Sequence, residues 1–323
     1  MRPGLMLASI APMKLAIEHV RRMRGGAQAQ MMRCNDDGYY IVKFQNNPQH
    51  LRILANEMLA TRLAARLGIC VPQVEVIEVR PELIAYTSEM VIQLGIGRKP
   101  CSAGKQFGSQ FPGHPARLTV HDFLPDEHLG GVWNLQDFLG IFVFDKWTCN
   151  TNGRQAIFFR EAEGASGPAS YSSPNQVSDR GRASHGLASP ASQVNASNSP
   201  DQARDIAPYV AMMIDHGFCF NAGEWDFPDA PLRGLYTRHR VYQSVTGMDA
   251  FEPWLDRLEK HMTEAALGEE AGHIPPEWYG DDWNALERLI ERLYARRKRV
   301  PELILSARNS GRLPFPNWKV QHV

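Results

Sequence analysis

The chain has 323 residues, of which 43% are hydrophobic, so it is long enough to fold as a globular protein with a sizeable buried core. Its 35 basic and 35 acidic side chains cancel, which argues against nucleic acid or an anionic membrane as a partner of the whole chain. No apolar run reaches the roughly 18 residues of a membrane span, and no export signal is recognisable. Five cysteines without a C-x-x-C pair are unlike a disulfide framework or a zinc site. We therefore expect a soluble, cytoplasmic protein without membrane association.

The first predicted element is a short helix over residues 15–23, which ends at Gly25 and Gly26. The loop that follows contains these two glycines and Gln28, between small and amide side chains. Such a loop would let backbone N–H groups approach a phosphate, although a loop with two glycines is more often an ordinary turn.

A β-hairpin follows, with strands predicted over residues 30–33 and 39–45 and an Asn-Asp-Asp-Gly turn between them. Lys43 lies inside the second strand between apolar neighbours. Its ammonium group must therefore either extend to solvent or meet a buried anion. Taken alone, the pattern favours an edge strand with a solvent-exposed lysine.

The next segment predicts a helix that begins at Pro48 and ends at Gly68, with one apolar face. Glu57 lies beside that face, near the middle of the helix. An acid at this position could reach Lys43 and form the ion pair that orients a lysine toward nucleotide phosphates. The alternative is an ordinary solvated acid on a helix surface.

Further elements alternate between strands, loops and helices. We expect a strand over residues 74–79, another near 83–92, a glycine-rich loop over 95–113 and a long helix over 135–148. Residues 161–205 are dominated by small and polar side chains, which predicts a disordered insertion in a loop.

The C-terminal part predicts an irregular loop over residues 221–236 and two helices with apolar faces over 251–267 and 282–298. A basic run over 296–299 ends the second helix. The helix dipole and solvation explain that run, so nucleic acid remains the less favoured interpretation.

Two stretches contain polar residues suited to catalysis or metal binding. The helix over 135–148 leads into a polar loop that contains Asn150 and Asn152, and an apolar strand follows over 156–159. Later, a buried strand pattern breaks at Asp215, which is followed by His216 and a glycine. A carboxylate at a strand end suits a Mg²⁺ ligand, and phosphoryl transfer needs little more than positioned groups and charge neutralisation. An isolated D-x-G sequence, however, is more often only a turn.

Several motifs in order resemble one family. They are RGGAQAQ, YYIVKF, NEMLATRLAARLGICVP, FGSQFPG, FDKWTCNTNGRQAIFF and MIDHGFCFNAGEWDFPDAPLRGLY. Together they resemble the HipA-like kinase-domain proteins of bacteria, over residues 15–298 apart from the insertion. The resemblance implies an α+β, bilobal protein-kinase-like fold, with a small β-rich N-lobe over 1–95 and a mainly helical C-lobe over 96–323.

The resemblance also implies ATP and Mg²⁺ as ligands. Lys43 would contact the nucleotide phosphates with Glu57 as its helical partner, and Asp215 would bind the metal. The loop of Gly25, Gly26 and Gln28 would cover the phosphates.

One position departs from the family pattern. An N-x-D sequence in the catalytic loop supplies an Asp that accepts the proton of the substrate hydroxyl, and an Asn five residues later binds metal. Here Asn152 stands in place of the Asp and Ile157 in place of the Asn. An amide accepts no proton at neutral pH, and a general base contributes about 10²–10⁴-fold to a rate. Asp145, Gln155 or His216 could substitute for the missing base.

Two functions therefore compete. The first is an ATP-dependent phosphotransferase acting on a protein Ser or Thr. The second is a nucleotide-binding pseudokinase that serves as a regulatory or interaction module, which Asn152 favours. A third interpretation without any nucleotide leaves the lysine in the strand and the aspartate after the strand unexplained.

Overall fold

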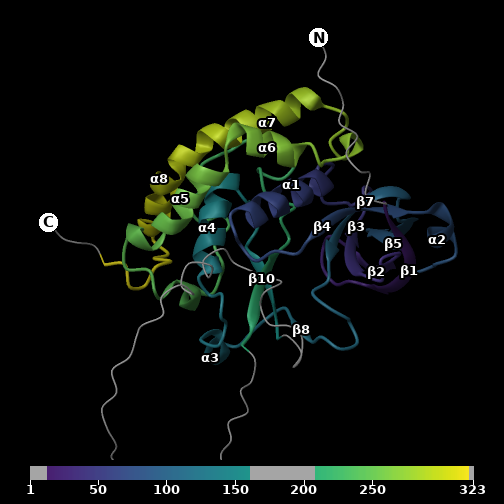
Figure 1. Ribbon diagram of the computed structural model, residues 1–323, viewed down its shortest axis with the longest axis horizontal. Helices are drawn as coiled ribbons and strands as arrows, with labels where there is room; N and C mark the ends of the chain where they lie inside the picture. The colour runs from purple at the N-terminus through teal and green to yellow at the C-terminus, as the bar shows by residue number, and fades with distance from the viewer. Residues whose placement is uncertain (1–12, 161–207, 320–323) are drawn as a thin grey trace, which may run out of the picture.

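The computed structural model describes residues 13–160 and 208–319, so the insertion predicted over 161–205 lies outside the described residues. Within these residues most strands lie in the N-terminal part and most helices in the C-terminal part (Figure 1). The expected α+β class, with a β-rich N-terminal part and a helical C-terminal part, is confirmed.

The N-terminal part is a closed five-stranded barrel with the strand order β1-β2-β3-β7-β4. Neighbouring strands are antiparallel except β1 and β4, which are parallel. Its interior is filled by apolar side chains, among them the fully buried Tyr40, Val42 and Ile77. The barrel strands are β1 (Lys14–Arg22), β2 (Gln30–Cys34), β3 (Tyr39–Lys43), β4 (Val74–Val79) and β7 (Gly104–Gln110).

Strand β1 corrects the prediction of a helix over residues 15–23. Two irregularities interrupt its pairing with β2, one between Ala16 and Glu18 and one between His19 and Arg21. A bulge shifts the alternation of inward and outward side chains by one position. The apolar residues of β1 therefore recur with a spacing that resembles a helix, although the backbone is extended.

Strand β7 corrects the prediction of a loop over residues 95–113. It pairs with both β3 and β4, so it is an interior strand of the barrel and lies beyond residue 95, where the N-lobe was expected to end. Its Gly108 is needed for close packing, because a Cβ atom there would lie 2.4 Å from Cγ1 of Ile77. Glycine at this position allows neighbouring parts of the barrel to approach closely, as glycines inside strands often do.

The segment between β4 and β7 also differs from the expected strand over 83–92. Pro81 begins a one-turn helix after the extended Arg80, and only the end of the segment is a strand. The elements are α2 (Pro81–Ala85), β5 (Val91–Leu94) and β6 (Gly97–Pro100), and the last two pair with each other.

Helix α1 (Ile53–Arg66) lies between the barrel and the C-terminal helices (Figure 1). It begins later than the predicted start at Pro48, because the side chain of Asn47 accepts a hydrogen bond from the backbone N–H of Gln49 and holds a turn there. The chain leaves the helix at Gly68, whose φ is +81°. Eleven residues of α1 are buried, Glu57 among them, which excludes the solvated-acid alternative.

The C-terminal part is organised around α4 (Asp137–Thr148), all of whose residues are buried. A three-stranded antiparallel sheet with the order β10-β9-β8 lies beside it. The sheet consists of β8 (Val120–His121), β9 (Gln155–Phe159) and β10 (Val210–Ile214). The helices are α3 (Asp126–Leu129), α5 (Glu252–His261), α6 (Glu264–Ala271), α7 (Trp283–Arg296) and α8 (Val300–Arg308), with short 3₁₀ helices at His239–Tyr242, Met248–Ala250, Pro276–Trp278 and Arg297–Arg299.

The single helix predicted over 251–267 is two helices, α5 and α6. The hydroxyl of Thr263 accepts a hydrogen bond from the N–H of Ala266 and so caps the start of α6. Across residues 13–160 and 208–319, no helix combines the length and the hydrophobicity that a membrane crossing requires.

Candidate active site

Three charged side chains from distant parts of the chain meet beside the barrel. Lys43 is the last residue of β3, Glu57 lies on α1, and Asp215 follows β10. The Lys43 Nζ donates a hydrogen bond to Oε1 of Glu57 and another, of 2.9 Å, to Oδ1 of Asp215. We refer to these three residues as the ion-pair cluster. The structure thus unites the strand lysine, the helical glutamate and the strand-end aspartate that the sequence singled out.

Burial and the attraction between opposite charges shift the pKa values of the ion-pair cluster in opposite directions. Burial disfavours the ammonium of Lys43, but the charges of Glu57 and Asp215 outweigh it, so the pKa of Lys43 is raised. Burial raises the pKa of Glu57 despite the nearby lysine. Burial also acts to raise the pKa of Asp215, but the charge of Lys43 outweighs it and the pKa of Asp215 is lowered. Of the two carboxylates, Asp215 is therefore the one whose charged form the surroundings favour.

Glu57 is fixed by the backbone that follows Asp215. Its carboxylate accepts hydrogen bonds from the N–H groups of His216, at 3.2 Å, and Gly217, at 2.8 Å. A Cβ atom on Gly217 would lie 2.7 Å from Cγ1 of Ile53 and 2.9 Å from Oε1 of Glu57. Glycine is therefore required after His216 so that the backbone can approach α1.

Asn56, the neighbour of Glu57 on α1, holds the next part of the same segment. Its fully buried Nδ2 lies 2.7 to 2.9 Å from the carbonyl oxygens of Gly217, Cys219 and Ala222. Its Oδ1 accepts a hydrogen bond of 2.7 Å from the indole N–H of Trp225. The sequence analysis missed this residue, although two adjacent polar residues inside an apolar helical segment are a signal for it.

Asp215 adopts a left-handed backbone conformation with a φ of +62°. This conformation is uncommon for residues other than glycine, asparagine and aspartate. The Oδ2 of Asp215 accepts a hydrogen bond of 2.7 Å from the side-chain amide of Gln155, the first residue of β9. Gln155 is exposed, so the structure brings this candidate residue to the solvent side of the ion-pair cluster.

His216 is buried and neutral. Its Nδ1 lies 3.3 Å from the hydroxyl of Thr61, and burial, with Arg154 and Lys43 nearby, lowers its pKa well below the usual value. Aromatic packing with Phe144 also holds the ring. A fully buried imidazole in this position supports the core beneath Asp215.

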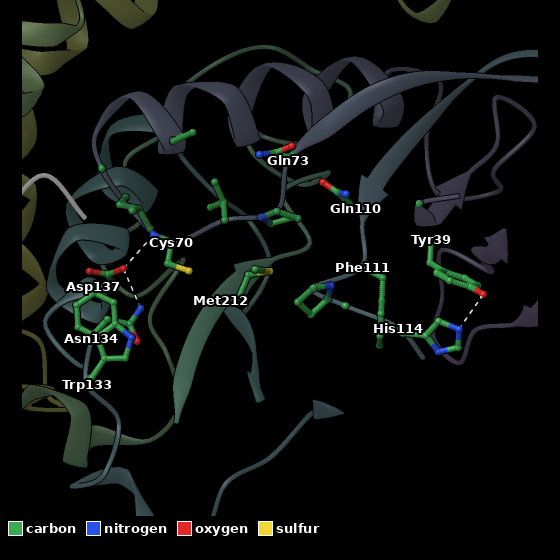
Figure 2. A pocket seen from close by; sticks show the side chains of 18 of the residues that line it. Tyr39, Cys70, Gln73, Gln110, Phe111, His114, Trp133, Asn134, Asp137 and Met212 are labelled. Carbon is green, nitrogen blue, oxygen red and sulfur yellow. Dashed lines mark hydrogen bonds between the residues drawn. The ribbon is translucent and has the colours of Figure 1, made fainter. Parts of the chain in front are cut away.

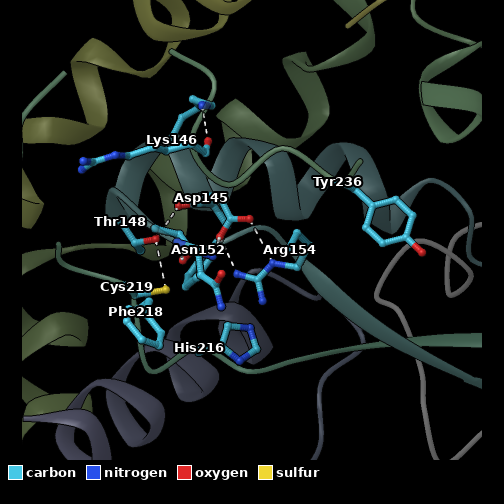
Figure 3. A network of polar contacts seen from close by, with 12 residues as sticks. Asp145, Lys146, Thr148, Asn152, Arg154, His216, Phe218, Cys219 and Tyr236 are labelled. Carbon is cyan, nitrogen blue, oxygen red and sulfur yellow. Dashed lines mark hydrogen bonds and ion pairs between the residues drawn. The ribbon is translucent and has the colours of Figure 1, made fainter. Parts of the chain in front are cut away.

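Asp145 and Arg154 form a buried ion pair below the polar loop (Figure 3). Arg154 donates to both carboxylate oxygens of Asp145, from Nε at 3.0 Å and from Nη2. Its Nη1 donates to the carbonyl oxygen of Ile214 at 2.8 Å. Both side chains are fully buried. Asp145, which the sequence offered as a substitute base, is therefore paired with Arg154 and lies away from solvent.

The polar loop is built on these two residues. Asn150 donates to Asp145 from its side chain, and its Oδ1 accepts a hydrogen bond of 3.0 Å from the N–H of Asn152. The N–H of Thr151 donates to the carbonyl oxygen of Phe218, so the loop also contacts the segment after Asp215. The helix before the loop ends at Cys149, whose φ is +52°. Asn152 is partly exposed, and its Oδ1 accepts a hydrogen bond from the N–H of Gly153.

The glycine loop joins β1 to β2. Gly25 has a φ of +113°, and the N–H of Gln28 donates to the carbonyl oxygen of Gly25. The side chain of Gln28 is bound to the backbone N–H and carbonyl oxygen of Gln93, which fixes the loop against β5. A Cβ atom on Gly26 would meet only the side-chain amide of Gln49, at 3.3 Å. Within the described residues, the loop of Gly25, Gly26 and Gln28 contacts Arg22, Gln49 and Gln93 and makes no hydrogen bond to the ion-pair cluster.

A cavity of about 670 Å³ lies between the segment after β7 and the C-terminal part (Figure 2). Phe111 and His114 line one side, and Trp133, Asp137 and Met212 line the other. Burial raises the pKa of Asp137 to about 6, against the opposing effect of hydrogen bonds to its carboxylate. The residues of the ion-pair cluster do not line this cavity.

The side chains around Asp215 determine whether a divalent metal could bind there. The described part of the chain has no group of three or more His, Cys, Asp or Glu side chains that could hold a metal ion. Mg²⁺ does not require one, because it is commonly held by one or two carboxylates together with substrate phosphates. The Asp215 carboxylate supplies hard oxygen ligands, and the side-chain amide of Gln155, whose nitrogen donates to Oδ2 of Asp215, places a further amide oxygen nearby. The residues present therefore fit Mg²⁺ when a nucleotide completes the ligand set.

Residues 16–156 match the family model described as HipA-like kinase. This stretch contains Lys43, Glu57, Asp145 and Asn152 and ends before Asp215. Over this stretch, which is less than half of the chain, the match confirms the resemblance to HipA-like kinases inferred from the motifs.

Solved structures of protein kinases are also similar to the chain. The Golgi casein kinase is 12% identical with a TM-score of 0.43, covering 91% of this chain and 74% of its own. A second structure of that kinase, with Mn/ADP bound, is 12% identical with a TM-score of 0.41, covering 92% and 74%. The Helicobacter pylori proinflammatory kinase CtkA is 11% identical with a TM-score of 0.39, covering 89% and 92%. A search of curated proteins finds no significant match.

Proposed function

We propose that the protein is an ATP- and Mg²⁺-dependent phosphotransferase of the HipA-like kinase type that acts on a Ser or Thr of a protein substrate. The observation that carries this proposal is the ion-pair cluster, in which one lysine contacts both a helical glutamate and the aspartate after β10. A strand lysine paired with a helical glutamate supports phosphate binding, because the ammonium so held can contact phosphate oxygens.

Each residue of the cluster has a separate role in this proposal. Lys43 would bind the nucleotide phosphates, and Glu57 would keep its ammonium in place. Asp215 and Gln155 would hold Mg²⁺, which neutralises charge on the phosphates when it is bound. The loop with Gly25, Gly26 and Gln28 would cover the phosphates from the barrel. The five free thiols suit a reducing bacterial cytoplasm.

Asn152 would orient the acceptor hydroxyl. In the transfer, the bond between the γ-phosphorus and the β,γ-bridging oxygen breaks, and a bond forms between the γ-phosphorus and the acceptor oxygen. The hydroxyl proton passes to water, because an amide accepts no proton at neutral pH. Asp145 is unsuited to the task of a base, since it is buried and bound by Arg154.

A nucleotide-binding pseudokinase is the second candidate function. The specific observation in its favour is Asn152, which is hydrogen bonded within its own loop and carries no charge. In this alternative the ion-pair cluster binds nucleotide and the protein acts as a regulatory or interaction module.

Two measurements separate these functions. The melting temperature with and without ATP and Mg²⁺ tests nucleotide binding, which both candidates require. Incubation with γ-labelled ATP then tests transfer to the protein itself or to a substrate. No shift in melting temperature at millimolar ATP and Mg²⁺ would contradict both candidates, whereas a shift without any transfer would favour the pseudokinase.

A further inference from the structure

A second cavity lies directly beside the polar loop. It has a volume of about 380 Å³. Thr151, Asn152 and Gly153 form one side, residues 230–234 form the other, and Arg312 closes it from the C-terminal segment. This volume is near the lower end of the about 300–1,000 Å³ of small-molecule sites, so it is suited to one or two side chains of a larger ligand. We refer to it as the acceptor pocket.

The wall opposite Asn152 is held rigidly. The buried Lys146 of α4 donates hydrogen bonds to the carbonyl oxygens of Pro231, at 2.7 Å, and Arg233. Gly234 has a φ of +73°, and a Cβ atom there would lie 2.4 Å from Cβ of Asp145. The wall is therefore fixed to the helix that also carries the polar loop. A pocket whose two sides are fixed relative to each other is preorganised for a ligand.

The charge of the acceptor pocket is positive. Arg233 and Arg312 are both exposed, and neither forms an ion pair with a carboxylate within residues 13–160 and 208–319. Arg233 donates one hydrogen bond to the neutral side chain of Asn221. No acidic residue lines the pocket. Two guanidinium groups without an acid between them favour an anionic ligand, because guanidinium binds carboxylate and phosphate with paired hydrogen bonds.

The pocket is close to the proposed site of phosphoryl transfer. Asn152 lines it, and Gln155, three residues later, donates to Asp215. Three extended residues span at most about 10 Å. A ligand group in the pocket therefore lies within a short peptide's reach of the ion-pair cluster.

We propose that the acceptor pocket selects protein substrates in which an Asp or Glu lies next to the Ser or Thr that is phosphorylated. Arg233 and Arg312 bind the acidic side chain, and Asn152 faces the neighbouring hydroxyl. This inference rests on the proposed function, because it assigns the substrate class of the same site. The proposal explains why two arginines lie beside the loop of Thr151, Asn152 and Gly153, which has no carboxylate.

The test uses fluorescently labelled peptides and measures binding by anisotropy in the presence of Mg²⁺ and a non-hydrolysable ATP analogue. One peptide carries a Ser flanked by Glu, and its partner carries Gln at the same positions. We expect the Glu peptide to bind roughly fivefold to thirtyfold more tightly at low salt, and this preference to shrink as salt is added. The measurement does not depend on catalytic turnover.

Arg312→Glu is the decisive variant, because Arg233 also supports Asn221. We expect it to abolish the preference for the Glu peptide while leaving ATP–Mg²⁺ binding unchanged. Arg288→Glu is the matched control, since Arg288 is exposed on α7 and does not line the pocket. It makes the same charge change and should retain the preference.

Several results would overturn the assignment. Equal binding of the Glu and Gln peptides would do so, as would equal effects of Arg312→Glu and Arg288→Glu. Competition by free glutamate at the same concentration as the peptide would assign the pocket to a small acid instead. A parallel ATP–Mg²⁺ titration separates this inference from the proposed function: absence of nucleotide binding overturns both, whereas normal nucleotide binding without an acid preference overturns the inference alone.

Discussion

Lys43 donates a hydrogen bond of 2.9 Å to Asp215, although 172 positions of the sequence separate the two residues. One charge comes from the barrel and the other from the end of a strand in the C-terminal part. The contact therefore exists only when both parts are folded against each other. In the proposed function, a nucleotide would compete with Asp215 for the ammonium of Lys43, and a cation bound to Asp215 would release that ammonium.

Removing either charge should weaken nucleotide binding in a distinguishable way. We expect Lys43→Ala to weaken ATP binding with and without Mg²⁺, because its role is toward the phosphates. Asp215→Ala should remove most of the gain in affinity that Mg²⁺ provides. Calorimetry with and without Mg²⁺ measures both effects.

The matched controls for these two variants are Lys260→Ala and Asp256→Ala, which remove an exposed ion pair on α5. They should bind ATP and Mg²⁺ as the wild type does. Circular dichroism confirms that every variant is folded. Wild-type affinity in both Lys43→Ala and Asp215→Ala would contradict the assignment of the nucleotide site.

A carboxylate in place of Asn152 should increase turnover. Asn152→Asp supplies a proton acceptor beside the acceptor pocket, and a positioned base contributes about 10²–10⁴-fold. We therefore expect faster ATP turnover or autophosphorylation at neutral pH. Labelled-phosphate release measures the rate.

Asn152→Gln is the control for this change, because it keeps an amide and should not accelerate the reaction. If the wild type already transfers phosphate efficiently and Asn152→Asp leaves the rate unchanged, the base is another group. If neither protein transfers phosphate although both bind ATP, the pseudokinase alternative gains support.

Gln155 should contribute to metal affinity. Its amide contacts Asp215 at 2.7 Å and stands two residues before Ile157, where the family pattern has a metal-binding Asn. We expect Gln155→Ala to raise the Mg²⁺ concentration required for half-maximal ATP binding, and Gln155→Glu to lower it by adding a charge. An unchanged Mg²⁺ dependence in both variants would limit Gln155 to a contact with Asp215.

The buried pair of Asp145 and Arg154 should be important for stability. Arg154→Ala leaves a fully buried carboxylate without its cation, and breaking such a pair costs about 3–5 kcal/mol. We expect a large decrease in the free energy of unfolding in urea. The double variant Asp145→Asn/Arg154→Met should recover part of this loss, because it removes both charges. A loss below about 1 kcal/mol in the single variant would show that the pair is dispensable.

The stability of the protein should depend on pH through Asp137. Burial raises the pKa of its carboxyl from 3.8 to about 6, so the folded protein retains a proton that the unfolded chain releases between these values. This contribution to stability is complete below the unfolded pKa and is lost as the pH rises through 6. Above that pH the ionised carboxylate destabilises the fold.

Asp137→Asn removes this dependence. We expect its free energy of unfolding, relative to wild type, to improve by up to about 3 kcal/mol between pH 4 and pH 7.5. Asp256→Asn, at an exposed position on α5, is the control and should show no such change. Parallel stability profiles for Asp137→Asn and the wild type would contradict the raised pKa.

The charged parts of the site were accessible from the sequence because each follows from a local pattern. A lysine inside a strand, an acid beside the apolar face of a helix and an aspartate at a strand end are each visible within a few residues. The order of these signals along the chain then indicated one family. The roles of Lys43, Glu57 and Asp215 toward a nucleotide remain predictions.

Other parts of the structure depend on contacts that a local pattern does not reveal. Bulges in β1 changed its apolar spacing, and Gly108 lies in a central strand because Ile77 fills the space of a side chain. Arg154 is buried because it pairs with Asp145, which lies nine residues earlier on another element. The role of Asn56 could not be predicted locally, because its hydrogen-bond partners lie more than 160 residues away.

Asn56 also restricts how helix α1 can move. Its one side chain contacts three carbonyl oxygens of the segment after Asp215 and the indole of Trp225, in addition to the bonds that Glu57 makes. An outward swing of α1 would break these contacts together and leave buried carbonyl groups without donors, which is costly. Helix α1 and the segment after Asp215 are therefore held together by one set of hydrogen bonds. Displacing α1 alone is therefore costly, and movement at the site is cheaper in the loops that border these contacts.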